Sequence, residues 1–442
     1  MEEKAPAWGI EPVPERLRVL GALDTGLLWG SLGVSLLVLV AGTFLVPALS
    51  LPTALLAIAV GGLLGNAMLA AAAAIGADAR VPGMVLLRAP LGRRGSYLPT
   101  GLNVVQNLGW ATFELIVIAT AASALADRAL GFGAKPAWTL LFGLVTTLFA
   151  LAGPISFVRR WVRRFAFWAV LVSLVYLTVW AVDRVDLGAL WNRPAEGGLS
   201  FWQAVDVMVA MPVSWLPLAA DYTRFARGRG PAFVGTGIGY LVPSVWLFAL
   251  GAILLIPDPV DVMTTIAGGG AASAVALLAL TVDETDEPFA NVYSTAVSLQ
   301  NVLPGVPQRA LIVAAGALAT GGALTIGLGH YLGFLYLLGS FFVPLFGVLL
   351  ADWALARGHY EPADILRARA LRIEQVGAWL AGFALYQWLQ PVGPSWWTDL
   401  VAHAAPPELE IGATLPSFAV SFALGATLGL VARRVRAASV PA

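Results

Sequence analysis

The sequence predicts an all-α membrane protein with about twelve transmembrane helices. Composition gives the first reason: of 442 residues, 59% are hydrophobic and 12% are charged, whereas soluble domains carry about 25% charged residues. A chain of this length with so few charges cannot cover a water-facing surface, so much of its surface must face lipid. The spacing of the apolar runs and the placement of arginine give two further reasons.

Apolar runs alternate with short charged clusters along the chain. A helix needs roughly 20 apolar residues to cross a bilayer. By that rule the expected spans are 22–47, 53–77, 97–127, 136–157, 161–183, 203–225, 231–256, 268–300, 308–329, 331–352, 374–391 and 413–433. The third and eighth spans are longer than a bilayer requires, which predicts that both are tilted.

Arginine-rich loops alternate with loops that contain few bases. With this set of spans, the following residues fall on one side of the membrane: Arg16, Arg18, Arg80, Arg88, Arg93, Arg94, Arg159, Arg160, Arg163, Arg164, Arg224, Arg227, Arg229, Arg357, Arg367, Arg369, Arg372, Arg433, Arg434 and Arg436. Exceptions on the opposite side include Arg128 and Lys135. By the positive-inside rule, both termini are cytoplasmic, and the expected location is a bacterial-type inner membrane.

Several classes of protein do not fit this sequence. The chain has no cysteine and three scattered histidines, and its net charge is +0. These counts exclude disulfides and thiolate metal sites and indicate no nucleic-acid partner. No phosphate-binding loop suggests ATP-driven transport, and no HExxH, GxSxG or CxxC motif supports an intramembrane enzyme. A channel would normally show repeated pore rings, which the sequence lacks.

Two of the expected spans contain helix-breaking residues near their centres. Span one contains Gly30 and Gly33, which let the backbone leave helical geometry at low cost. Span six contains Pro212 and Pro217, which deprive carbonyls one turn earlier of their donors. Inside a membrane such backbone is tolerated where it lines a cavity or finds new partners.

The positions of these breaks predict the domain organisation. Spans one and six open two five-helix halves, 22–183 and 203–352, after an N-terminal segment, 1–21, and before two extra helices within 374–433. Matching breaks in two halves are typical of inverted-repeat transporters, whose binding site lies at the breaks. The sequence therefore predicts one transporter domain over residues 1–442. The alternative is that glycine and proline only kink or pack these helices.

Span three has polar residues at mid-membrane depth. Asn107, Trp110 and Glu114 have the spacing i, i+3, i+7, which places them on one helical face. A charge at that depth costs about 2.5–3.5 kcal/mol on insertion scales. Trp110 offers a flat face on which a ring can stack, and the Glu114 carboxylate can accept hydrogen bonds from ring or amine N–H groups. Taken alone, Trp110 would more often be a packing or interfacial residue, but Asn107 and Glu114 on the same face favour a role in binding.

Span eight carries four acidic residues within Thr281–Pro288. Thr281, Glu284 and Thr285 share a face, and Pro288 removes the usual donor to the Glu284 carbonyl, which we expect to be free for a ligand. Oxygen ligands of these kinds suit a hard cation such as Na⁺. Clustered acids also oppose one another's ionisation, so one of them can hold an exchangeable proton. We assign Glu284 and Asp286 to the site.

The remaining acids of span eight and the centre of span six complete the set of candidates. Asp283 and Glu287 could instead line a wet vestibule. Ser214 and Trp215 lie between the two prolines of span six, and Trp215 could cover the second face of a bound ring. Asp221 and Arg224 at the end of span six have i, i+3 spacing and are interpreted as structural or gating residues.

Three segments resemble the first of the two nucleobase–cation symporter families, and the likeness extends over nearly the whole chain. They are GRRGSYLPTGLNVVQNLGW (92–110), PVSWLPLAADYTRFAR (212–227) and VPLFGVLLADW (343–353). The subgroup that they resemble transports cytosine and hydroxymethylpyrimidine. The resemblance implies a LeuT-like inverted-repeat fold with two extra C-terminal helices.

The resemblance also implies roles for individual residues. Trp110 would stack on the ligand, with Asn107 and Glu114 beside it and Ser214 and Trp215 opposite. A sodium ion would lie between spans one and eight. Its ligands would be the carbonyls of Gly30, Gly33 and Thr281 and the side chains of Glu284 and Thr285. Relatives tend to carry neutral residues where this chain has acids, so both Na⁺ and H⁺ stay open as the coupling ion.

The substrate expectation follows from the acids and the resemblance together. A stacking tryptophan faced by carboxylates suits a flat ring that is rich in donors. We expect import of a small pyrimidine, with hydroxymethylpyrimidine first, cytosine second, and a hydantoin or purine third. No organic cofactor is expected, and the oligomeric state is left open.

Overall fold

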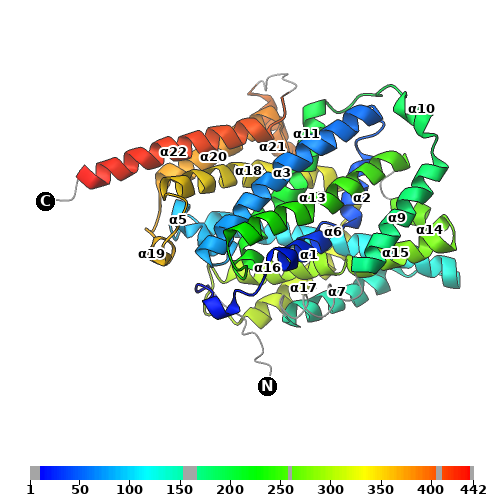
Figure 1. The fold of residues 1–442 in the computed structure, drawn as a ribbon, viewed down its shortest axis with the longest axis horizontal. Helices are drawn as coiled ribbons and strands as arrows, with labels where there is room; N and C mark the ends of the chain where they lie inside the picture. The colour runs from blue at the N-terminus through cyan, green and yellow to red at the C-terminus, as the bar shows by residue number, and fades with distance from the viewer. Residues whose placement is uncertain (1–9, 153–166, 257–260, 405–410, 439–442) are drawn as a thin grey trace.

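The computed structural model describes residues 10–152, 167–256, 261–404 and 411–438. In these ranges the regular structure is helical apart from one isolated bridge, between Leu20 and Ala226. The prediction of an all-α protein is therefore confirmed (Figure 1). Residues 153–157 and 161–166, at the facing ends of expected spans four and five, lie outside the described residues, as do Arg159 and Arg160.

Each expected span coincides with one helix or with a consecutive pair. In chain order these are α1 (Ala22–Leu32) with α2 (Leu36–Thr43), α3 (Leu51–Ala79), α6 (Tyr97–Leu130), α7 (Lys135–Ala152), α9 (Phe167–Arg184), α11 (Phe201–Ser214) with α12 (Leu216–Thr223), α13 (Arg229–Leu254), α15 (Ala271–Asp283) with α16 (Asp286–Leu299), α17 (Gln308–Thr325), α18 (Tyr331–Leu355), α20 (Ile373–Leu389) and α22 (Thr414–Ala438). Shorter helices connect them: η1 (Glu15–Leu17), α4 (Gly83–Leu86), α5 (Arg88–Leu91), α10 (Leu187–Trp191), α14 (Val262–Gly268), η4 (Leu328–His330), α19 (Pro362–Leu366) and α21 (Ser395–Ala402).

Length and apolarity identify many of these helices as membrane-spanning. In the described part of the chain, 7 helices are long and apolar enough to cross a membrane, or 8 if the bent pair α1–α2 counts as one span. The described part of α9, the pair α15–α16, α17 and α20 do not meet that criterion, although each coincides with an expected span. The protein is accordingly a multi-pass helical membrane protein.

The helices pack as two groups that contact each other sparingly. The first group consists of α1, α2, α3, α11, α12 and α13, and the second contains α6, α7, α15, α16 and α17. Within the first group, α13 lies so close to α1 and α2 that only glycine fits at two contact points. A Cβ at Gly239 would overlap the Gly26 carbonyl, and one at Gly251 would overlap the Leu39 carbonyl. Small residues permit such close backbone contact in membranes.

The two predicted breaks are confirmed, and their geometry differs. The break in span one covers Gly33–Ser35, and its halves meet at a bend of 56°. The break in span six is a single residue, Trp215, between the two prolines. That span still qualifies as one membrane-spanning helix from Phe201 to Thr223, so its break is the milder one.

Span eight is also broken, which the sequence analysis did not predict. The prediction of a single tilted helix over 268–300 is wrong, because α15 ends at Asp283 and α16 begins at Asp286. Acidic residues and proline both favour the first turn of a helix, and Asp286, Glu287 and Pro288 occupy that turn of α16. The prediction that the Glu284 carbonyl is free is likewise wrong, since this carbonyl accepts a hydrogen bond from the Glu287 N–H at 3.2 Å.

The last two spans lie at one side of the bundle. Helices α18, α20 and α22 pack together, and α22 extends away from the rest of the molecule towards the C-terminus (Figure 1). The buried Asp206 carboxylate of α11 accepts hydrogen bonds from the N–H groups of Ala413 at 2.6 Å and Thr414 at 3.4 Å. This carboxylate therefore caps the start of α22 and ties it to span six.

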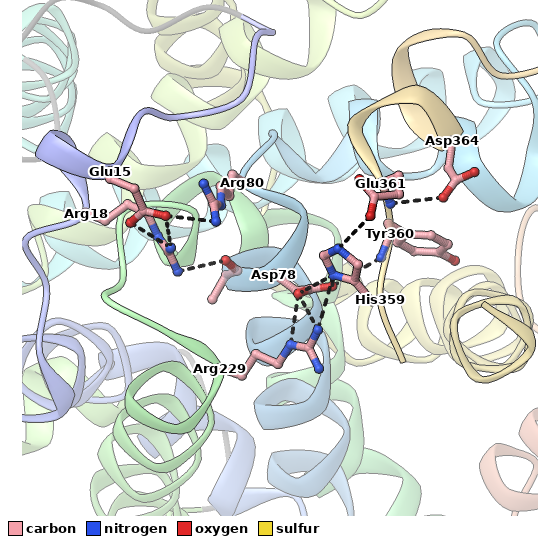
Figure 2. Close-up of polar contacts among 10 residues, drawn as sticks. Glu15, Arg18, Asp78, Arg80, Arg229, His359, Tyr360, Glu361 and Asp364 are labelled. Carbon is pink, nitrogen blue, oxygen red and sulfur yellow. Dashed lines mark hydrogen bonds and ion pairs between the residues drawn. The ribbon is translucent and has the colours of Figure 1, made fainter. Parts of the chain in front are cut away.

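Loops that the sequence analysis placed on one side of the membrane meet on one face of the structure. Figure 2 shows the Asp78 carboxylate at the end of α3 accepting from Arg229 Nε at 2.9 Å, and in contact with His359 Nδ1 at 2.9 Å. Glu15 forms ion pairs with Arg18 at 2.9 Å and Arg80 at 2.8 Å. We call this surface, formed by the loops around residues 15–18, 78–80, 227–229 and 357–372, the arginine-rich face. Its assembly supports the order of the spans, and its cytoplasmic orientation stays a prediction.

The orientation can be tested with single cysteines, because the natural chain contains none. Ala363→Cys lies on the arginine-rich face, and Ala195→Cys lies in the exposed loop between α10 and α11. In intact cells we expect a membrane-impermeant maleimide to label Ala195→Cys and to label Ala363→Cys only after the membrane is opened. The reverse pattern would invert the topology, and labelling of both in intact cells would contradict the order of the spans.

Candidate substrate and ion site

The breaks of spans one and eight meet through a single carboxylate. Glu284, which is 1% exposed, accepts from the Leu36 N–H at 2.7 Å and from the Ser35 hydroxyl at 2.9 Å. Both donors lie at the start of α2, where backbone N–H groups have no partner within the helix and the helix dipole favours negative charge. Glu284 thus completes the N-terminus of α2 from the opposite group of helices.

A second acidic cluster connects α6 to α16. The Asn291 amide donates to both oxygens of Glu114, at 2.9 Å and 3.1 Å. The side chains of Glu114 and Glu287 lie within hydrogen-bonding reach of each other. Two buried carboxyl groups in contact repel each other when both are ionised, so the pair favours taking up a proton or a cation. This pair is the chemically distinctive feature of the site.

The register between α6 and α16 places Asn107 beside this cluster. Glu114 lies opposite Asn291, and Asn103 donates to the Ser298 hydroxyl at 2.7 Å, so the two helices run antiparallel. Asn107 lies between these two contacts. It is fully buried, and both its amide nitrogen and its amide oxygen lack a hydrogen-bond partner among the described residues.

Other polar atoms near this point are also unpaired. Within the described part, the Trp110 indole N–H, one Glu287 oxygen and both Asp286 oxygens have no hydrogen-bond partner, although Ser31 of the first break lies beside Asp286. Nearly all buried polar groups in folded proteins are paired. This concentration around the breaks therefore indicates a place for a bound ligand or for ordered water.

Aromatic residues surround the same region. Trp110 packs edge-on against Tyr331 and Phe334, with ring centroids 5.9 Å and 5.3 Å away. Trp215 packs edge-on against Trp29 at 5.7 Å and donates its indole N–H to the Tyr240 hydroxyl at 3.1 Å. The indole N–H of Trp215 is therefore committed to the protein, while that of Trp110 is available to a ligand.

Four of the predicted ligand residues already contact other parts of the protein, three through hydrogen bonds of their hydroxyls and one through close packing. The hydroxyls of Ser214, Thr281 and Thr285 donate to carbonyls of their own spans, at 2.7 Å in each case. Gly33 packs closely against Pro243 and Tyr240 of α13. Among the five predicted cation ligands, Glu284 forms hydrogen bonds that join spans one and eight, and the described residues show no such bond for the other four.

The sequence analysis left open whether Asp283 and Glu287 line a wet vestibule, and in the structure the two side chains have different surroundings. Asp283 lines a cavity of about 410 Å³ between α1, α9 and α13, which Gly30 and Ser31 also line. Its other lining residues are apolar or glycine, so the wet vestibule stays a prediction. Glu287 instead faces Glu114. Asp221 accepts from the Gly83 N–H at 2.9 Å, and Arg224 donates to the Asp221 carbonyl at 3.2 Å, so their structural interpretation fits these contacts.

Sequence reasoning missed several residues of the site, chiefly Asn291, Ser35 and Tyr331. Asn291 follows Glu287 by one helical turn, so continuing the polar face of span eight would have identified it. Ser35 caps α2 by accepting from the Leu37 N–H at 3.1 Å, and a serine directly before an apolar run is a recognisable cap. Tyr331, which donates to the Leu37 carbonyl at 3.2 Å, carries no local signal of this kind.

Comparison with known proteins identifies the family. The pattern of a family described as permease for cytosine/purines, uracil, thiamine, allantoin matches residues 12–370. The chain belongs to this permease family. It is thus a nucleobase–cation symporter family member and a transporter rather than an enzyme, as the resemblance implied.

Individual relatives are distant. The hydantoin permease of Microbacterium maritypicum is 27% identical over 305 residues, which cover 62% of this chain and 60% of that protein. The cytosine permease of Escherichia coli strain K12 is 26% identical over 352 residues, which cover 77% and 79%. The chain therefore spans less than two thirds of the hydantoin permease and more than three quarters of the cytosine permease.

Solved structures confirm the LeuT-like fold. Mhp1, a nucleobase-cation-symport-1 family transporter in a closed conformation with bromovinylhydantoin bound, has a TM-score of 0.79 at 20% identity, over 97% of this chain and 95% of its own. The inward-facing conformation of Mhp1 has a TM-score of 0.75 at 19% identity, over 98% and 96%. The boundaries 22–183 and 203–352 of the two halves stay a prediction.

The Glu114–Asn291 contact yields a stability test. Asn291→Leu leaves the buried Glu114 carboxyl without its amide donor, which we expect to lower the free energy of unfolding by about 1–3 kcal/mol. The double variant Glu114→Leu/Asn291→Leu removes both partners, so it should recover much of that loss. Thermal unfolding of the purified protein measures both.

The exposed Asn192 provides the matched control, and Asn192→Leu should change stability by about 0.5 kcal/mol or less. If Asn291→Leu is no more destabilising than Asn192→Leu, the contact does not support the site.

Proposed function

We propose that this permease is a secondary active importer of a small pyrimidine-type ring, with hydroxymethylpyrimidine as the first candidate and a proton as the coupling ion. The observation that carries the proposal is the unpaired, buried amide of Asn107 and indole of Trp110 beside the Glu114–Glu287 carboxyl pair. An aminopyrimidine offers a flat face to Trp110, N–H donors to the carboxyl pair, and a mixed edge to the Asn107 amide.

The same contacts favour a donor-rich ring over one with mainly carbonyl groups. Glu114, Asp286 and Glu287 bring acceptors to this region and lie on the two helices, α6 and α16, that enclose it. A ring edge of carbonyl oxygens could accept from the Asn107 amide or the Trp110 indole, but it would leave the oxygens of these carboxyl groups without donors, which is costly for buried acceptors. Cytosine is the second candidate. Hydantoins, which the relatives' names include, are third.

Coupling to a proton is favoured by how the acids are used. Both oxygens of Glu284 already accept hydrogen bonds, from the Ser35 hydroxyl and the Leu36 N–H, so this carboxylate has little capacity left for a cation. The Glu114–Glu287 pair, in contrast, favours taking up a proton, since two buried carboxyl groups in contact repel each other when both are ionised. Sodium bound to backbone carbonyls of the first break is the alternative, and the experiments below separate the two.

Movement of the two helix groups would carry substrate across. Besides Glu284, the contacts between the groups include Gln106 donating to the Ser214 carbonyl at 2.8 Å and Tyr222 donating to the Ala290 carbonyl at 3.3 Å. Rocking one group against the other breaks such contacts and exposes a site between them to alternate sides. Substrate and ion raise each other's affinity by the same factor, which couples uptake to the ion gradient.

The substrate assignment is tested by uptake into proteoliposomes. Hydroxymethylpyrimidine, cytosine and hydantoin are offered in turn, and we expect saturable uptake with the lowest KM for hydroxymethylpyrimidine. Trp110→Ala should raise that KM about 5- to 150-fold, because stacking on an aromatic side chain contributes about 1–3 kcal/mol. Exposed Trp396→Ala is the control. Equal KM values for the two variants would exclude Trp110 from the binding site.

The coupling ion is tested by imposing a proton gradient, a sodium gradient or neither. We expect an inward proton gradient alone to drive accumulation. Glu287→Gln should abolish that accumulation but retain exchange of labelled for unlabelled substrate, because an amide can still contact a ring but cannot release a proton. Asp283→Asn, in the separate cavity, should keep proton-driven uptake. Accumulation that follows sodium and persists in Glu287→Gln would establish the alternative.

A further inference from the structure

A second cavity, separate from the candidate site, opens on the arginine-rich face. Its volume is about 610 Å³, and the ends of α18, α20 and α22 surround it together with α5 and α19. It contains five arginines and three carboxylates. The arginines are Arg357, Arg367, Arg369, Arg372 and Arg433. We call this feature the arginine cavity.

The carboxylates of the arginine cavity are already engaged by other groups. Asp352 forms an ion pair with Arg372 at 2.9 Å and lies 3.6 Å from Arg433. Asp364 accepts from the Glu361 N–H at 3.0 Å, and Glu361 faces His359 at 3.5 Å (Figure 2). The charge of Asp352 is therefore balanced by Arg372, while Glu361 and Asp364 make local contacts and keep their charges, so the five arginines outnumber the three carboxylates.

Hydrogen bonds and an ion pair connect the residues at the floor of the cavity. Arg372, which is 8% exposed, also donates to the Ala89 carbonyl at 2.7 Å. Burial, and to a lesser degree the neighbouring Asp352 carboxylate, raise the pKa of Tyr360, so its phenol stays protonated and donates to Asp352 at 3.1 Å. The charges of Arg372 and Asp352 thus balance each other at the floor of the cavity, and Tyr360 adds no charge.

Three arginines on the wall have no such partner. Arg357, Arg367 and Arg369 are exposed, and none takes part in an ion pair or side-chain hydrogen bond within the described residues. Their backbone is nonetheless held in place: the Arg369 carbonyl accepts from the Arg93 N–H at 2.8 Å, and the Arg367 N–H donates to the Ala363 carbonyl at 3.0 Å. Three unpaired guanidinium groups therefore line one concave wall.

We propose that the arginine cavity binds a phosphate group, either the phosphodiester of an anionic lipid headgroup or a free phosphate. A guanidinium group donates two parallel hydrogen bonds to phosphate oxygens, a geometry that a wall of several arginines suits. The cavity lies at the ends of α18 and α22, which are long and apolar enough to span a membrane, and beside the start of α20, an expected span. The ends of spanning helices lie at the depth of lipid headgroups, and basic pockets between such helices bind anionic lipids. Positive-inside bias explains arginines in this loop but does not require a shared cavity.

A bound phosphate would bridge the segment after α18 and the segment before α20 on one wall of the cavity. Arg357 follows α18, while Arg367 and Arg369 precede α20, and α5 lies directly beneath through Ala89. The adjoining His359 contacts Asp78 at the end of α3. Occupancy would therefore brace the two extra helices and the loop after span ten against the first helix group.

Purified full-length protein in detergent tests this proposal. Phosphatidylglycerol, phosphatidylcholine and inorganic phosphate are titrated separately, and binding is followed by native mass spectrometry and by the thermal unfolding midpoint. The variant is Arg357→Gln/Arg367→Gln/Arg369→Gln, whose three side chains are exposed and unpaired, so folding should be unaffected. Arg309→Gln is the control, an exposed arginine outside the cavity.

We expect phosphatidylglycerol, but not phosphatidylcholine, to bind the wild type and Arg309→Gln and to raise their unfolding midpoints. The triple variant should bind at least about tenfold more weakly, since it lacks three groups that donate charge-assisted hydrogen bonds to phosphate. Saturation by inorganic phosphate with no added effect of the lipid would identify a soluble ligand for the same site. Equal binding of both anions by the triple variant and the wild type would overturn the proposal.

Discussion

The hydrogen bonds between Glu284 and the start of α2 are the constraint on which the centre of the structure depends. A carboxylate in the middle of a membrane needs several donors, and an intact helix has none to offer. The broken span one supplies them as the Leu36 N–H and the Ser35 hydroxyl. The broken span eight in turn lets Glu284 reach them. Each break therefore satisfies the polar groups that the other one exposes.

Because the two helix groups otherwise contact each other sparingly, these breaks also define where a site can form. Asn107, Trp110 and Glu114 project from α6 of the second group, opposite α16, and the two breaks adjoin them. Of these three residues, Asn107 and Trp110 have unpaired polar atoms. A ligand bound at the proposed site would contact both groups at once, which is what alternating access requires of a carrier.

The sequence predicted the spans, the first two breaks and the acidic centre because each has a local physical signature. Glycine and proline at mid-span, apolar length and charges at membrane depth can all be recognised without knowing what lies opposite. The choice of partners has no such signature. Nothing local shows that Asn291 pairs with Glu114 or that Glu284 caps α2. The break at Glu284–Thr285 was missed for the same reason, since it depends on donors from a segment 248 residues away.

The acids of span eight, which look alike in the sequence, are distinguished by their partners. Glu284 caps a helix, Glu287 contacts Glu114, Asp283 lines a separate cavity, and Asp286 lies beside Ser31. A carboxylate whose oxygens are both committed to structural donors has little capacity left for a substrate. One that faces a second carboxyl group favours taking up a proton or a cation. The proposed mechanism therefore assigns ion exchange to the pair on α6 and α16, while the hydrogen bonds of Glu284 hold the two breaks together.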